Sequence, residues 1–181
     1  VPTNATDFDI NWFWLKNAGK PGWETLAQIG QSTPTRQSSA GNMVNAVISG
    51  EALAGYFVSA ISVFPKFPDA EPVLGWSYIT DGQPILVRGQ AITAAAKAPN
   101  SAKLLMDFVL SAEGQVAVSQ GGLTAYREDM ASQAERHLSA ITEAVGADNM
   151  VYFSLDPELL DQAVKDAFLE RWDTTVPAPS Q

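Results

Sequence analysis

The spacing of apolar residues over the first 60 positions alternates between helical and extended periodicities, which predicts an α/β arrangement. Two helices are expected at the start of this stretch, over residues 7–18 and 22–29. Thr6 and Asp9 form a capping box at the beginning of the first helix, and Gly19 is suited to end it. The chain is therefore expected to begin its ordered part with a helical pair.

A third amphipathic helix is predicted after Ser38 and Ser39, with either serine as its N-cap, and it is expected to end at Gly50. Its apolar face consists of four residues: Met43, Val44, Val47 and Ile48. The apolar run that follows, residues 52–57 (ALAGYF), is expected to form a buried strand.

The pattern changes between Phe64 and Pro84, where prolines and glycines interrupt it repeatedly. This composition predicts a crossover near residues 76–84 between two α/β segments. We therefore divide the chain into residues 1–78 and 79–181.

Residues 84–96 are expected to form one extended run that is broken at Gly89, and a helix over 101–110 is expected to follow it with Asn100 as the N-cap. The helical periodicity places three apolar residues on its inward face: Leu105, Phe108 and Val109.

Three more helices complete the predicted chain. A short one begins at Ser111, buries little surface and ends at the glycine pair 121–122. Two longer ones are expected over residues 131–145 and 157–172, the last with Asp156 as its cap.

Charge and cysteine content narrow the classes of partner and site. The formal charge of −9 and the pI near 4.4 disfavour nucleic acid and anionic lipid as partners, because no basic run interrupts the acidic surface. The absence of cysteine excludes disulfides, thiol catalysis and zinc–thiolate sites. No apolar stretch approaches the roughly 18 residues needed to span a bilayer. The start at Val1, without a methionine or a signal peptide, indicates a processed or truncated chain.

Three blocks of sequence carry a family resemblance: VPTNATDF (1–8), MVNAVISGEALAGYF (43–57) and the stretch 81–122. In the last block a strand, a capped helix, a Ser-x-Glu-Gly-Gln sequence and a glycine pair follow in order. Together the blocks resemble the type II periplasmic solute-binding proteins of ABC importers, especially the group that includes the ferric-iron-binding proteins. The resemblance covers about residues 1–127.

The resemblance implies an α/β fold of two lobes, each with a mixed sheet flanked by helices and with a ligand cleft between them. Residues 1–78 would be part of the second lobe, and residues 79–181 would return into the first. The chain would then be incomplete at its N-terminus, so that a missing N-terminal half or self-association would cover its open sheet edges. The implied function is that of an extracytoplasmic, periplasmic component that hands a solute to an ABC permease in the membrane.

The first candidate binding residues form the loop that precedes the first helix. Backbone N–H groups and hydroxyls at a helix start can hold an anion, although a simple helix cap explains the same residues. The family's anion-holding loop matches four positions: Thr3, Asn4, Ala5 and Thr6.

Four further residues are candidates for the same ligand. Ser38 and Ser39 offer a second serine-rich helix start, which capping alone explains equally well. Ser59 belongs to a segment expected to line the cleft. Trp76, near the crossover, is a core or rim residue that could face a ligand.

The resemblance brings in ferric iron as an alternative ligand. The iron-binding members carry two adjacent tyrosines, whose positions fall here on Ala60 and Ile61, and neither residue can bind a metal. Tyr56 and Phe57 lie in the expected strand and are read as core residues. We therefore expect a small phosphorylated or carboxylated organic anion, with no metal site and no cofactor.

An enzyme is the remaining alternative, as an α/β hydrolase or transferase lobe in which Ser59 or His137 would have to act. His137, the only histidine, is expected on the solvated face of an amphipathic helix. No nucleophile elbow, phosphate-binding Gly-Lys loop or His-Glu-x-x-His helix occurs. The sequence therefore predicts binding without catalysis.

Overall fold

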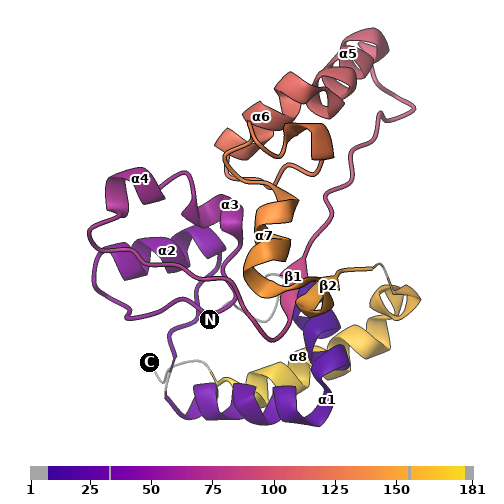
Figure 1. Cartoon of the computed structure of the whole chain (residues 1–181). Helices are drawn as coiled ribbons and strands as arrows, with labels where there is room; N and C mark the ends of the chain where they lie inside the picture. The colour runs from indigo at the N-terminus through magenta and orange to yellow at the C-terminus, as the bar shows by residue number, and fades with distance from the viewer. Residues whose placement is uncertain (1–7, 33, 155, 178–181) are drawn as a thin grey trace. The chain divides into compact units, whose positions relative to one another are not determined.

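The computed structural model describes residues 8–32, 34–154 and 156–177 (Figure 1). The chain folds as two compact units, and the first of them is discontinuous in sequence. The first unit comprises the described residues up to Ser59 together with those from Phe153 onward, and the second is Ala60–Tyr152. The predicted division of the chain into lobes at residues 78 and 79 stays a prediction.

The first unit consists of helices. Its elements are α1 (Phe8–Gln31), α2 (Ala40–Ile48), the 3-10 helix η3 (Pro157–Leu160) and α8 (Gln162–Thr175). Gly19 interrupts α1 with φ 60° and ψ −144°, a conformation that favours glycine, so α1 is a pair of helical halves. The predicted helices 7–18 and 22–29 are these two halves.

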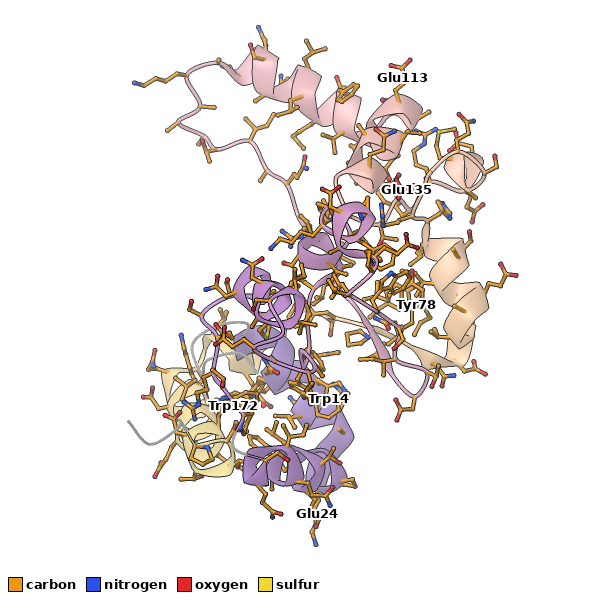
Figure 2. The ribbon with its side chains drawn as sticks, turned by 90° about the vertical axis from the view of Figure 1, so that its left-hand side faces the viewer. Trp14, Glu24, Tyr78, Glu113, Glu135 and Trp172 are labelled. Atoms are coloured by element: carbon orange, nitrogen blue, oxygen red, sulfur yellow. The ribbon has the colours of Figure 1, made fainter. Side chains whose placement is uncertain are left out.

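The core of the first unit lies between α1 and α8. It is formed by Trp12, Leu15, Leu26, Phe168, Trp172 and Val176. Figure 2 shows Trp14 and Trp172 on this unit. Trp23 of α1 and Phe168 of α8 pack with their ring centroids 5.5 Å apart, and Lys16 at the rim donates a hydrogen bond of 2.7 Å to Asp156. Two segments distant in sequence are thus held together mainly by aromatic packing.

Helix α2 confirms the prediction for its stretch. Ser39 is the N-cap, and its Oγ accepts the Asn42 N–H at 3.1 Å. Met43 and Val44 on the predicted apolar face are buried. Capping and helical periodicity were sufficient here because both act within the helix itself.

The buried strand predicted over residues 52–57 is wrong. Leu53 is fully exposed and Phe57 adopts a left-handed backbone with φ 58°, which a regular strand does not allow. The aromatic rings of this run pack on α1 instead, with Phe57 5.7 Å from Trp14.

The second unit combines short helices with a small parallel sheet. Its elements are α3 (Ala60–Val63), α4 (Phe67–Ala70), β1 (Gln83–Ile85), α5 (Pro99–Leu110), α6 (Ala112–Gln120), η1 (Glu128–Met130), α7 (Leu138–Val145), η2 (Ala147–Asn149) and β2 (Met150–Tyr152). Strands β1 and β2 lie side by side in Figure 1, with Gln83 opposite Met150 and Ile85 opposite Tyr152.

The α/β class is therefore confirmed in a helix-rich form. In the described part of the chain the only sheet is this two-stranded one. The extended run predicted over residues 84–96 forms strand only as far as Ile85, and the residues after it are loop.

Helix α5 begins before its predicted cap and exposes its predicted inward face. Its N-cap is Ala98, so the prediction of Asn100 in that role is wrong. Leu105 and Phe108 are 62% and 45% exposed, and Val109 is only partly buried. The periodicity indicated an apolar face correctly, but no described element covers it fully.

Helix α6 confirms the predicted start, because the Ser111 Oγ accepts the Gly114 N–H at 3.1 Å. The prediction that this helix buries little is wrong: Gly114, Gln115 and Ser119 are all buried. A Cβ atom at Gly114 would lie 1.8 Å from the Phe108 carbonyl oxygen, so only glycine allows α6 to follow α5 this closely.

The C-terminal helices are shorter than predicted. Helix α7 ends at Gly146 as expected but begins only after His137, because η1 and turns occupy residues 128–136. The helix predicted over 157–172 is divided: Asp156 caps η3, and Asp161 caps α8. In the described part of the chain no helix is both long and apolar enough to cross a membrane.

Candidate functional site

Aromatic rings in the second unit gather around Trp76. Its ring centroid lies 4.9 Å from that of Phe64 and 5.0 Å from that of Tyr78, in both cases edge to face. Phe67 follows at 6.4 Å. Phe64 is buried directly after α3, whereas Trp76 is 43% exposed. The cluster therefore presents one large ring at the surface and is anchored by another beneath it.

Arg136 brings a positive charge to this cluster. Its guanidinium carbon lies 4.1 Å from the centroid of the Phe64 ring, a cation–π contact. It donates a hydrogen bond of 3.1 Å to the Ser119 carbonyl oxygen and forms an ion pair of 2.7 Å with Glu135. The Arg136 side chain is largely buried, so its orientation is fixed by these contacts.

Burial and the charge of Arg136 both affect the pKa of Tyr78 in this cluster. Burial raises the pKa of its phenol, and the nearby charge of Arg136 acts in the opposite direction. Figure 2 labels Tyr78 and Glu135 in the second unit. Tyr78 consequently keeps its proton and can donate a hydrogen bond.

Together these residues have the chemistry of a site for an organic anion. An exposed indole offers a contact surface for apolar or aromatic groups, and a guanidinium is the side chain best matched to a carboxylate or phosphate. The Glu135 carboxylate that now pairs with Arg136 is 58% exposed. Because the glutamate side of this ion pair is in contact with solvent, a ligand anion could take the place of Glu135 without first entering a buried site.

The predicted site residues Ser38 and Ser39 lie in the first unit and act as helix-capping groups. Besides the Ser39 cap, the Ser38 Oγ accepts a hydrogen bond of 3.1 Å from the Asn42 side-chain amide. A shallow pocket of about 290 Å³ lies beside this helix start, lined by Gln37, Asn42, Asn45, Ala46, Ser49 and Glu51. Its one charged group is acidic, so the pocket itself does not add a cation for an anionic ligand.

The remaining predicted site residues are separate from this helix. Thr3, Asn4, Ala5 and Thr6 lie outside the described residues. Ser59 is partly buried immediately before α3. Trp76 is the one predicted site residue that the structure places in a cluster with a cation.

The tyrosines do not form a metal site in the described part of the chain. Ala60 and Ile61, which stand at the positions of the iron-binding tyrosines, lie in α3. The Tyr56 hydroxyl is buried without a hydrogen-bond partner, and burial raises its pKa, which disfavours the tyrosinate that ferric iron requires. Tyr126 is 55% exposed. Nowhere among the described residues do three or more His, Cys, Asp or Glu side chains come together as metal ligands.

The prediction that His137 lies on a solvated helix face is wrong. His137 is buried as the N-cap of α7, with Nε2 2.9 Å from the Arg127 carbonyl oxygen and Nδ1 accepting the Ser139 N–H at 3.1 Å. With Nδ1 accepting, Nε2 carries the proton and donates it. Both nitrogens are engaged in holding the chain, which leaves neither for a substrate.

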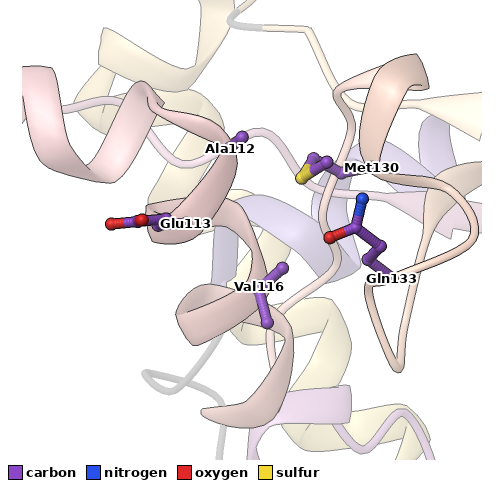
Figure 3. A pocket seen from close by; sticks show the side chains of 5 residues that line it. All are labelled: Ala112, Glu113, Val116, Met130 and Gln133. Carbon is purple, nitrogen blue, oxygen red and sulfur yellow. The ribbon is translucent and has the colours of Figure 1, made fainter.

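A second depression, of about 310 Å³, lies between α6 and the η1 region (Figure 3). It is lined by Ala112, Glu113, Val116, Met130 and Gln133. The Glu113 carboxylate points away from Met130 and Gln133. This leaves an apolar surface with a single amide, which has little to fix a polar ligand.

Sequence reasoning missed Arg136 as a site residue, because an arginine next to a glutamate is the usual pattern of a solvated surface. Its role can be recognised only in three dimensions, where the guanidinium stacks on Phe64.

Comparison of the chain with protein-family models, with curated proteins and with solved structures finds no significant match.

Proposed function

We propose that this protein is the extracytoplasmic, periplasmic solute-binding component of an ABC transporter, and that it binds a small phosphorylated or carboxylated organic anion and passes it to a membrane permease. The transporter class rests on the resemblance of residues 1–8, 43–57 and 81–122 to type II solute-binding proteins. The finer fold, two lobes with mixed sheets, is part of the same proposal. The chain leaves its first unit after Ser59 and re-enters it at Phe153, which is compatible with a protein whose chain crosses between two bodies.

The observation that carries the ligand class is the contact of Arg136 with the aromatic cluster around Trp76. The Arg136 guanidinium stacks on Phe64, and the same ring contacts the exposed Trp76 indole, an arrangement that suits a ligand with both an anionic group and an organic body. Ferric iron is favoured less, because Ala60 and Ile61 offer no ligand atom and Tyr56 is held protonated. Catalysis is favoured less, because His137 has no free ring nitrogen.

The test compares three probes on the intact protein: benzoate, phenyl phosphate and inorganic phosphate, titrated by calorimetry. We expect the two aromatic anions to bind more tightly than inorganic phosphate, because their ring contacts Trp76. Trp76→Ala should remove this preference and weaken benzoate binding about tenfold. Tyr126→Ala is the matched control, since it removes another exposed ring of the same unit.

A second pair of variants tests the role of the cation. Glu135→Gln should tighten benzoate binding several-fold, because the probe no longer competes with a carboxylate for Arg136. Ser39→Ala and Thr6→Ala test whether the helix starts of the first unit share in binding. Native mass spectrometry of the protein purified without refolding would identify any co-purifying solute. Tight binding of ferric ion with a tyrosinate charge-transfer band, or turnover of a bound solute, would contradict the proposal.

A further inference from the structure

The end of α6 lies against the segment that contains Phe64. Gly122, which follows the helix, has φ 89°, and a Cβ atom there would lie 2.8 Å from Pro65 Cδ and 3.3 Å from Ile61 Cα. Both the backbone conformation and this close approach favour glycine. The glycine pair that ends α6 therefore lets the last carbonyl groups of the helix come close to residues 61–65, and Arg136 is held at this junction.

Ser119, in the last turn of α6, contacts two successive residues of the site. Its carbonyl oxygen accepts a hydrogen bond of 3.1 Å from Nη1 of Arg136, and its hydroxyl accepts the Glu135 N–H at 3.1 Å. The hydroxyl also donates to the Val116 carbonyl oxygen at 3.0 Å, and Ser119 is 0% exposed. One buried serine thus fixes both the main chain before Arg136 and one end of its guanidinium.

The contacts of the Arg136 guanidinium leave one of its ends for a ligand. Phe64 lies against a face of the group, and Ser119 holds Nη1. Nη2 pairs with the Glu135 carboxylate, which is 58% exposed. A ligand anion that takes the place of Glu135 therefore meets the guanidinium at Nη2, in an orientation that is set before binding. A group that is already oriented loses less conformational entropy when the ligand binds.

We infer that Ser119 is a positioning residue of the proposed anion site, which orients the Arg136 guanidinium so that Nη2 faces the ligand. The inference rests on the proposed function. Because Ser119 is fully buried, it acts through Arg136 and not by contact with the ligand. The affinity for an anion then depends on the orientation of the cation as well as on its charge.

Calorimetric titration with benzoate tests this role in the Glu135→Gln background, where no carboxylate of residue 135 competes for Arg136. Ser119→Ala should weaken benzoate binding about fivefold there, because the N–H of residue 135 loses its acceptor and the guanidinium is no longer held in one orientation. Ser111→Ala is the matched control, since it removes the capping hydroxyl at the other end of α6 and should leave the affinity unchanged. Circular dichroism checks that both variants keep their helices.

A double-mutant cycle separates positioning from a general effect on the fold. Arg136→Lys keeps the positive charge but has a single nitrogen, which cannot be held by Ser119 and bind an anion through different atoms. In the Arg136→Lys variant, Ser119→Ala should therefore cause no further loss of benzoate affinity. Equal losses of affinity with and without Arg136→Lys would show that Ser119 affects binding through the fold alone, and would overturn the inference.

The NMR signals of the Arg136 guanidinium provide a measurement that needs no ligand. The guanidinium lies over the Phe64 ring, so the ring current should shift its protons upfield, and Arg136→Lys identifies these signals by their loss. Ser119→Ala should move the signals toward the values of a free arginine, whereas Ser111→Ala should not. If no probe binds the unsubstituted chain, the proposed function fails and the signals still test the positioning. Unchanged signals in Ser119→Ala, or an unchanged affinity for benzoate where it binds, overturn the inference.

Discussion

The two units are stabilised by different kinds of buried side chain. In the first unit the largest fully buried residues include Trp172, Leu15 and Leu26, which are apolar. Among the described residues, the buried polar residue of the first unit is Asn11, whereas the second unit buries Gln115, Ser119 and His137 beside apolar residues such as Phe64 and Ile141. Both units thus depend on the burial of apolar surface, and the second depends in addition on buried hydrogen bonds with defined geometry.

The polar residues of the second unit connect α6 to the loops that follow it. The Gln115 amide donates to the Val109 carbonyl oxygen at 2.9 Å, and its Oε1 accepts the Tyr126 N–H at 3.2 Å. The Ser119 hydroxyl accepts the Glu135 N–H at 3.1 Å. Helix α6, which looks like a spacer in the sequence, is therefore the element that orders the loop leading to Arg136.

This difference has a consequence for function. Apolar packing tolerates small movements of the side chains. When one partner of a buried hydrogen bond is removed, by contrast, the other polar atom is left unsatisfied. The aromatic cluster with its cation lies in the unit whose loops depend on such bonds. Its geometry is consequently sensitive to single polar substitutions far from Trp76 in sequence.

The largest expected effect is a loss of stability when the apolar core of the first unit is disrupted. Trp172→Ala removes a side chain that is 1% exposed and leaves a cavity between α1 and α8. We expect a loss of about 3–5 kcal/mol in the free energy of unfolding, measured by urea denaturation. Trp76→Ala is the matched control, and it should cost clearly less because Trp76 is partly exposed. Equal losses in the two variants would show that the core between α1 and α8 does not stabilise the chain as described.

The next largest effect is expected when the buried hydrogen bonds of Gln115 in the second unit are removed. Gln115→Met keeps the side-chain volume but leaves the Tyr126 N–H and the Val109 carbonyl oxygen without their partner, at a cost of about 1–3 kcal/mol. Amide hydrogen exchange should accelerate at Tyr126, and it should stay unchanged around Trp172. Gln120→Met, at an exposed position of the same helix, should alter neither. Unchanged exchange at Tyr126 in the Gln115 variant would contradict the role given to this amide.

Local signals in the sequence predicted the helices well where the decisive contacts are local. The Ser39 and Ser111 caps and the ends at Gly19 and Gly146 each depend on atoms within one turn of the helix. The start of the helix predicted at residue 131 failed because a 3-10 turn and loop contacts outweigh the helical pattern there.

Predictions failed where distant residues decide the outcome. The run 52–57 is apolar enough for a strand, but no neighbouring strand pairs with it among the described residues, and its rings pack on α1. Buried Gln115 and His137 have side chains that are polar and usually exposed, so their burial follows only from partners that the fold brings to them. For the same reason Trp76 could be selected from its position near the crossover, whereas Arg136 could not.

The smallest expected effect is a pH dependence of the contact that closes the first unit. The hydrogen bond from Lys16 lowers the pKa of Asp156, and the Glu158 backbone N–H lowers it further. Because the folded pKa lies below the unfolded value, the carboxylate stabilises the fold above about pH 4, and this contribution is lost as the pH falls through the folded pKa. Asp156→Asn should therefore lower stability at pH 7, and its difference from the unsubstituted chain should shrink as the pH falls below about 4.

Asp129→Asn provides the comparison with the second unit. The hydrogen bond from Arg127 lowers the pKa of Asp129, as Lys16 does for Asp156, but Arg127 and Asp129 are close in sequence. Lys16 and Asp156, by contrast, join the two chain segments of the first unit. Both carboxylates are at the surface, so both effects should weaken with added salt. Urea denaturation between about pH 3 and 7 should show a pH-dependent loss for Asp156→Asn and a smaller one for Asp129→Asn, since a local pair persists in part when the chain unfolds. A larger loss of stability in Asp129→Asn than in Asp156→Asn would contradict the importance given to the Lys16–Asp156 contact of the first unit.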